Sequence, residues 1–210
     1  MNYKKGEKII SLTWQGNGIC WHKGYEMLYS PNALNKVIGF LNEHHIPYMV
    51  IGGLAISTWG EPRVTYDADF KVSIDMPLAD FRKLVLEHFP GRATNNPLHK
   101  LCPRVIHIWA LPNMAADLLV SIFDYEKQAI KHAMEVDILG VKVRVCTGED
   151  LIIHKSIAER GKDWDDIEGI LMRQRGKLDL AYIRNWLSQF AEALEKPEIL
   201  TRFNQLYETT

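Results

Sequence analysis

Cysteine is scarce in this chain, and the usual metal-binding spacings are missing. The 210 residues include three cysteines, Cys20, Cys102 and Cys146, which lie far apart and form no C-x-x-C pair. An odd number of isolated cysteines implies neither a disulfide framework nor a cysteine-based zinc site. The eight histidines contain no H-x-x-x-H or H-E-x-x-H pair, so a helical zinc motif is not expected either.

The chain also has no large excess of charge of one sign and no long apolar run. Lys and Arg number 25 against 26 Asp and Glu, which gives a net charge of −1. This balance removes the global electrostatic reason for coating nucleic acid or an anionic membrane and leaves only a local basic groove open. No apolar run approaches the roughly 18 residues of a membrane span, and the stretch after the basic N-terminus is too short and polar for a signal peptide. We therefore expect a cytoplasmic protein with no membrane partner.

The composition that is present is typical of a folded domain. Hydrophobic residues make up 47% and charged residues 24%, which is enough to bury a sizeable core. Because a typical domain has roughly 150 residues, we expect one domain with an appended piece. The pattern predicts an N-terminal arm over 1–30, a mixed body over 31–147 and a helical region over 148–210 that completes the domain. The expected fold class is α+β (mixed α/β), with a small mixed sheet flanked by helices.

Helical periodicity alternates with β-prone runs along the body. A helix is predicted over 31–45, then a buried strand over 48–51, a Gly52-Gly53 turn and a short helix over 54–59. The remaining predicted elements are a strand over 63–75, helices over 77–89, 124–134, 149–159, 163–173, 178–194 and 197–207, a hairpin of 104–111 with 114–122, and two short strands within 136–145. The arm over 1–30 has no clear period, and 91–103 is predicted as a loop.

Carboxylates gather on the strand predicted over 63–75. Side chains two apart on a strand point to the same face, so Asp67 and Asp69 lie side by side. Two neighbouring anions repel unless a cation sits between them, and hard carboxylate oxygens suit Mg²⁺. Asp117, on a run that can pair beside this strand, offers a third carboxylate. The Gly52-Gly53 turn at a helix start lets backbone N–H groups meet a phosphate.

Each of these features also has an ordinary structural interpretation. A glycine pair is more often only a tight turn, and two acids on an exposed sheet face are often solvated surface. What favours a metal–phosphate site is the order and spacing of the pieces together.

These motifs resemble a known family. The run Val50-Ile51-Gly52-Gly53, followed after 13 residues by Asp67-Ala68-Asp69-Phe70, is similar to the signature of the DNA polymerase β-like nucleotidyltransferase superfamily, with Asp117 in the place of its third acid. The later residues that extend the resemblance are Leu139-Gly140-Val141, Gly148-Glu149-Asp150-Leu151, Lys155, Arg160 and Lys162-Asp163-Trp164 with Asp166-Ile167. They resemble the AbiEii-type branch of bacterial proteins, which includes toxins of toxin–antitoxin pairs, and small antibiotic nucleotidyltransferases. The similarity covers roughly residues 33–172.

The resemblance implies an activity and its site. NTP and Mg²⁺ (or Mn²⁺) would be used to transfer a nucleoside monophosphate to a hydroxyl of RNA such as tRNA, of a protein or of a small molecule. Asp67 and Asp69 would hold the metal, and Asp117 would complete a second metal position or take the acceptor's proton. For a toxin, an antitoxin protein would be a partner. The alternative is a catalytically silent nucleotide-binding or interaction protein that keeps this fold.

The implied nucleotide-binding residues are Gly52, Gly53, Arg63 and Lys155. Arg63 has a surface ion pair as its alternative role. Lys155 has an i,i+4 pair with Glu159 as its alternative. For Asp163 and Asp166, a role at the start of a helix is favoured over a role as ligands.

Overall fold

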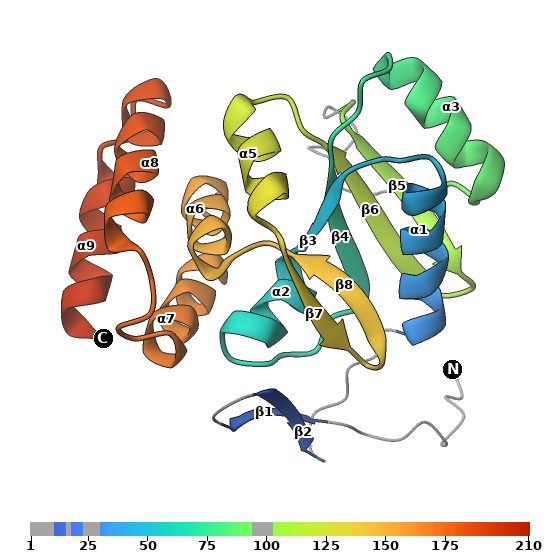
Figure 1. Cartoon of the computed structure of the whole chain (residues 1–210). Helices are drawn as coiled ribbons and strands as arrows, with labels where there is room; N and C mark the ends of the chain where they lie inside the picture. Colours follow the sequence, from blue (N-terminus) through green and yellow to red (C-terminus); the bar gives the residue numbers. More distant parts are fainter. Residues whose placement is uncertain (1–10, 16–17, 23–29, 94–102) are drawn as a thin grey trace.

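The computed structural model describes residues 11–15, 18–22, 30–93 and 103–210 (Figure 1). A six-stranded mixed sheet with helices on both faces forms the body. This confirms the predicted mixed α/β fold class. The predicted arm over 1–30 and the loop over 91–103 lie partly outside the described residues. Within the arm, β1 (Ser11–Gln15) and β2 (Gly18–His22) form an antiparallel hairpin.

The other elements follow the predicted order closely. The strands are β3 (Tyr48–Ile51), β4 (Asp67–Val72), β5 (Val105–Leu111), β6 (Met114–Val120), β7 (Met134–Ile138) and β8 (Val141–Val145). The helices are α1 (Pro31–Glu43), α2 (Gly52–Trp59), α3 (Leu78–His88), α5 (Asp124–His132), α6 (Gly148–Ala158), α7 (Asp163–Arg173), α8 (Leu180–Ala193) and α9 (Glu198–Thr209). Among the helices of the described ranges, none is both long enough and apolar enough to cross a membrane.

The strand order of the large sheet is β5-β6-β4-β3-β8-β7. β4 therefore lies inside the sheet, parallel to β6 and antiparallel to β3. In the β4–β6 pairing Asp69 stands directly opposite Asp117. The topology thus brings together acids that are 48 positions apart in the chain.

The two faces of β4 are buried by different layers. Ala68, Phe70 and Val72 are fully buried in the apolar core. On the other face Lys71 is buried in an ion pair with Glu126 of α5. Figure 1 shows α1 and α3 on one side of the sheet and α5 and α6 on the other. Asp67 and Asp69 share the face of Lys71, because side chains alternate along a strand.

The strand predicted over 63–75 is shorter in the structure, where only Asp67–Val72 form β4. Pairing with β6 begins at Ala115 and pairing with β3 involves only residues 48–51, so residues 63–66 have no neighbouring strand to bond. Val64 is 40% exposed and Tyr66 68% exposed, although in a continuous strand both would share the buried face of Ala68 and Phe70. Residues 63–66 instead form a loop, and Arg63 at its start bonds to Asp166 in the first turn of α7.

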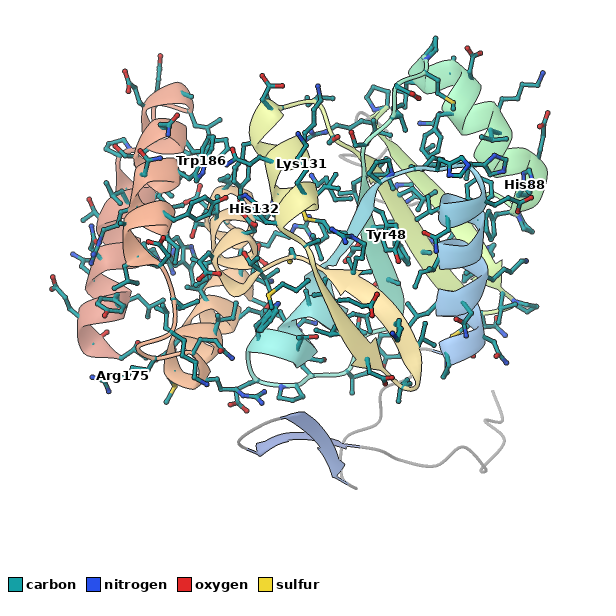
Figure 2. All side chains as sticks on the ribbon, in the orientation of Figure 1. Tyr48, His88, Lys131, His132, Arg175 and Trp186 are labelled. Atoms are coloured by element: carbon teal, nitrogen blue, oxygen red, sulfur yellow. The ribbon has the colours of Figure 1, made fainter. Side chains whose placement is uncertain are left out.

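The helical C-terminal region packs on the body through a buried carboxylate. Asp150, in the first turn of α6, is fully buried and accepts hydrogen bonds from Tyr125 of α5 at 3.0 Å and Tyr182 of α8 at 2.8 Å. Thr147 caps the same helix by accepting from the Asp150 N–H. Figure 2 labels His132 and Trp186 at this junction of α5 and α8.

Candidate functional site

Three acids occupy neighbouring positions on the paired strands β4 and β6, with Asp69 opposite Asp117. Asp67 and Asp69 are partly exposed, and Asp117 is buried. Burial, with the negative charges of Asp67 and Asp117, raises the pKa of Asp69 to about 7, while Arg160 and Lys155 act in the opposite direction. A carboxyl group so destabilised in its charged form is a favourable place for a cation, because a cation relieves the repulsion.

The glycine turn lies directly against these acids. Gly52 has a φ of +65°, and a β-carbon built there would lie 2.0 Å from Oδ2 of Asp69. A β-carbon on Gly53 would lie 2.5 Å from the Thr65 hydroxyl oxygen. Both positions therefore require glycine, one for backbone conformation and both for space. α2 begins at Gly52 with no side-chain cap, so the first N–H groups of this helix are free of a capping side chain, at the end of the helix that contacts Asp69.

Thr65 orients the first acid. Its hydroxyl is buried and lies 3.2 Å from Oδ1 of Asp67 and 3.1 Å from the Asp67 carbonyl oxygen. The Thr65 hydroxyl hydrogen can be donated to either of these Asp67 oxygens. This contact holds the loop of residues 63–66 against Asp67. Thr65 is thus a positioning residue for Asp67.

Asp117 is held by two residues that sequence reasoning did not select. Arg92 forms an ion pair with Oδ1 of Asp117, and Nδ1 of His107 lies 2.8 Å from the same oxygen. Because a carboxylate oxygen accepts, Nδ1 is the protonated ring nitrogen in this contact. Both contacts involve Oδ1, and no residue of the described ranges bonds to Oδ2 in the structure.

Asp67 and Asp69 fit a divalent cation, as hard oxygen donors on one face of one strand. Within residues 30–93 and 103–210, however, no three His, Cys, Asp or Glu side chains gather as a metal site. Asp117, directed to Arg92 and His107, does not join the other two as a preformed ligand set. Its assignment as a third metal ligand stays a prediction.

Arg63 and Lys155 both form ion pairs with acids of α7, and of the two cations only Lys155 is buried. Lys155 is buried, with Nζ 2.9 Å from Oδ1 of Asp163 and 2.6 Å from Oδ2 of Asp166. Arg63 makes two hydrogen bonds to Asp166, at 3.1 and 3.2 Å. Each cation therefore already has carboxylate partners, and direct contact with a nucleotide stays a prediction for both.

Two alternative roles from the sequence are not observed. Glu159 forms its ion pair with Lys196 rather than with Lys155. Asp163 and Asp166 do lie in the first turn of α7, but neither caps it, because the N-cap residue is Lys162 and no side chain bonds there; both carboxylates accept from Lys155.

Arg160 differs from Arg63 and Lys155 because its side chain has no carboxylate partner among the described residues. It was not predicted as a site residue. It is exposed in the turn between α6 and α7, and its backbone N–H donates to Oδ2 of Asp163 at 2.9 Å. Its guanidinium makes no ion pair with the described residues, yet it lies close enough to Asp69 to favour the charged form of that carboxyl, lowering its pKa. The sequence feature that could have identified Arg160 is its position between Lys155 and Asp163, two residues that also belong to the family resemblance.

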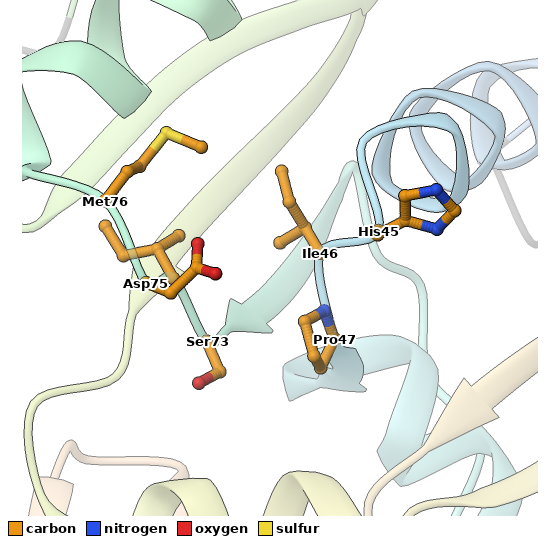
Figure 3. Close-up of a pocket in the computed structure, with 7 residues that line it drawn as sticks. His45, Ile46, Pro47, Ser73, Asp75 and Met76 are labelled. Atoms are coloured by element: carbon orange, nitrogen blue, oxygen red, sulfur yellow. The ribbon is translucent and has the colours of Figure 1, made fainter.

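A small surface pocket lies away from the acids. It has a volume of about 190 Å³ and is lined by His45, Ile46, Pro47 and residues 73–76 (Figure 3). These residues precede β3 and follow β4, so the pocket is at the opposite end of the antiparallel β3–β4 pair from Asp67 and Gly52. It is therefore not part of the candidate active site.

Comparisons with known proteins agree with this architecture. The antigenic nucleotidyltransferase-like protein from Paracoccidioides brasiliensis has a TM-score of 0.50 at 17% identity, covering 84% of this chain and 94% of its own. The solution structure of the antibiotic-resistance factor ANT(2'')-Ia has a TM-score of 0.53 at 16% identity, with 79% and 93% covered. ANT(2'')-Ia in complex with adenylyl-2''-tobramycin has a TM-score of 0.51 at 16% identity, with 77% and 96% covered. At these identities the likeness shows the fold.

Among curated proteins, none matches this chain. The profile of one family, described as nucleotidyl transferase of unknown function (DUF2204), matches residues 30–205. That match takes in the sheet, the glycine turn, the acids and most of the C-terminal helices, and the chain therefore belongs to this nucleotidyl transferase family.

Proposed function

We propose that the protein transfers a nucleoside monophosphate from an NTP to an acceptor hydroxyl, with Mg²⁺ or Mn²⁺ held at Asp67 and Asp69. The observation that carries this proposal is the contact between Asp69 and Gly52. It puts a carboxylate pair beside the uncapped start of α2, so a triphosphate on the helix N–H groups would meet the metal-binding acids. When bound, the divalent cation neutralises the triphosphate and the leaving pyrophosphate.

The chemistry assigns a task to each part of the site. The acceptor oxygen forms a bond to the α-phosphorus, the bond from that phosphorus to the bridging oxygen breaks, and pyrophosphate leaves. Oδ2 of Asp117 takes the hydroxyl proton, since Oδ1 is occupied by Arg92 and His107. Arg160, exposed and unpaired within the described residues, contacts the phosphates. Lys155 and Arg63 act through Asp163 and Asp166 by fixing the turn that carries Arg160.

The test is transfer of label from an α-labelled NTP. Each NTP is incubated with Mg²⁺ and with bulk tRNA, the protein itself or an aminoglycoside as acceptor; ATP comes first, because a structural neighbour holds an adenylylated antibiotic. Asp67→Asn and Asp69→Asn should each lower transfer by about a thousandfold, as loss of a group that organises transition-state charge does. Asp75→Asn is the matched control, because Asp75 is exposed and follows the far end of β4.

Two outcomes would contradict the proposal. Transfer that survives in Asp69→Asn would remove the site assignment. Saturable NTP binding by calorimetry, without transfer to any acceptor, would favour the alternative of a silent nucleotide-binding protein.

A toxin role is tested separately in cells. If the acceptor is an essential RNA, expression of the wild-type chain slows growth and expression of Asp69→Asn does not. Growth that is equal with both chains would separate the activity from a toxin role.

A further inference from the structure

Arg92 brings a positive charge to the third acid of the site. Its guanidinium is paired with Oδ1 of Asp117, and a planar guanidinium is well suited to pair with a carboxylate. His107 adds a second donor to the same oxygen at 2.8 Å. Asp117 is therefore compensated by the protein itself before any ligand arrives.

The position of Arg92 is built into the sheet edge. Its backbone N–H donates to the carbonyl oxygen of His107 at 2.9 Å, and Trp109 N–H donates to the carbonyl oxygen of Pro90 at 2.9 Å. Gly91 forms a bridge with Ile108. Residues 90–92 thus run along the outer edge of β5, and this places the Arg92 guanidinium beside Asp117. The guanidinium carbon lies 5.9 Å from the centre of the Trp109 ring.

Asp67 and Asp69 are in the opposite situation. Among the described residues no cation forms an ion pair with either carboxylate, and only the Thr65 hydroxyl contacts Asp67. The two carboxylates lie on the same face of β4, so their neighbouring negative charges repel. Asp67 and Asp69 therefore lack a neighbouring cation, whereas Asp117 has one in Arg92.

We propose that Arg92 takes the place of a second divalent cation, so that the site binds one metal ion per nucleotide and Asp117 is not a metal ligand. This inference rests on the proposed nucleotidyl transfer. In two-metal sites the ions lie about 3.5–4 Å apart and stabilise the attacking and leaving oxygens. Here Arg92 and His107 both contact Oδ1 of Asp117, so the negative charge that would attract a second ion is already compensated by the protein.

The experiment counts metal ions by Mn²⁺ electron paramagnetic resonance, with protein in excess over an α,β-methylene ATP analogue. The wild type should bind one Mn²⁺ per protein–nucleotide complex and give the signal of an isolated ion. Two bound ions, or the coupled signal of a close Mn²⁺ pair, would overturn the inference.

Variants of Arg92 provide the decisive comparison. Arg92→Ala frees Asp117 and should raise the count from one to two, whereas Arg92→Lys keeps a charge and should leave it at one. The double variant Arg92→Ala/Asp117→Asn should return to one ion. A count that stays at one in Arg92→Ala would contradict the inference; if Arg92→Ala does not fold, Arg92→Gln serves the same test.

The controls separate this inference from the proposed function. Arg175→Ala changes an exposed arginine beyond α7 (Figure 2) and should leave the count unchanged. If the wild-type chain binds neither nucleotide nor Mn²⁺, or if binding survives in Asp67→Asn/Asp69→Asn, the proposed function fails. If binding needs both acids but the complex holds two ions, only the role of Arg92 fails.

Discussion

The Asp69 carboxylate packs directly on the α-carbon of Gly52, with space for no side-chain atom between them. Oδ2 would lie 2.0 Å from a β-carbon at residue 52. The candidate metal-binding acid and the candidate phosphate-binding turn are therefore in direct contact.

Gly52→Ala should abolish most of the activity. The methyl group must displace the carboxylate, and a misplacement of about 1 Å can cost on the order of 100-fold in rate. The left-handed backbone adds a stability cost of roughly 1–2 kcal/mol. Transfer assays and urea unfolding measure the two effects separately.

The matched control for this change is Gly140→Ala. Gly140 also has a positive φ, of +79°, but a β-carbon there meets no atom within 4 Å. It should lose similar stability and keep its activity. Equal loss of activity in both variants would mean that backbone strain, rather than contact with Asp69, causes the defect.

The raised pKa of Asp69 predicts that the metal-free protein is less stable above pH 7. The folded protein holds a proton on Asp69 up to about pH 7, whereas an unfolded Asp loses it near a pKa of about 3.9. This stabilisation is complete below the unfolded pKa and is lost as the pH rises through 7. Asp69→Asn removes the charge, so it should be more stable than the wild type at pH 8, while the two differ less at pH 6.

Urea unfolding at pH 6 and pH 8, with and without Mg²⁺, checks this expectation. Mg²⁺ should restore stability to the wild type at pH 8 and not to Asp69→Asn. In Asp75→Asn the pH dependence should match the wild type. A wild type that gains stability from pH 6 to pH 8, relative to Asp69→Asn, would contradict the assignment.

Arg160→Gln should weaken NTP binding without unfolding the protein. Loss of a charge-assisted hydrogen bond costs about 1.5–3 kcal/mol, which is roughly 10- to 150-fold in affinity. Because Arg160 is exposed and its side chain has no ion pair in the described residues, stability should change by less than about 0.5 kcal/mol. Calorimetric NTP titration and urea unfolding test the two halves, and Arg175→Gln is the exposed control.

Lys155→Met should show the reverse pattern. It leaves Asp163 and Asp166 buried without their lysine, and breaking a buried ion pair costs about 3–5 kcal/mol. Its main effect is therefore on unfolding, with loss of nucleotide affinity following from the displaced turn. If Lys155→Met keeps full stability and loses only affinity, Lys155 contacts the nucleotide itself, as the family resemblance implies.

The acids and the glycine turn were predictable because they depend on local patterns. Alternation along 67–72 and the helix start at Gly52 follow from neighbouring residues, and they meet because β3 and β4 pair with Ile51 opposite Asp69. The buried face of β4 was predicted for the same reason. Its length was not, because a strand ends where its neighbours end, and that depends on distant residues.

His107 shows why the rest of the site was missed. Counting back from the Pro112-Asn113 turn pairs Leu111 with Met114 and would place Ile108 opposite Asp117. The structure has an irregularity between Trp109 and Leu111 that shifts the register, so that His107 stands opposite Asp117. A shift of one residue moves a side chain to the other face, and no short-range signal announces it. Arg92 was missed because it lies 25 residues before its partner, in a predicted loop without period.

Tyr182→Phe should destabilise the whole domain in a single transition. The change removes a 2.8 Å hydrogen bond to the buried carboxylate of Asp150, worth about 1.5–3 kcal/mol for a charged partner. If residues 148–210 complete the domain, as the sequence predicts, the urea midpoint falls while the slope of the transition is unchanged. Tyr207→Phe is the control, since the Tyr207 hydroxyl has no hydrogen bond within the described residues. Two separate transitions would instead mean that α8 and α9 unfold independently of the sheet, and that the hydrogen bond to Asp150 does not couple them to it.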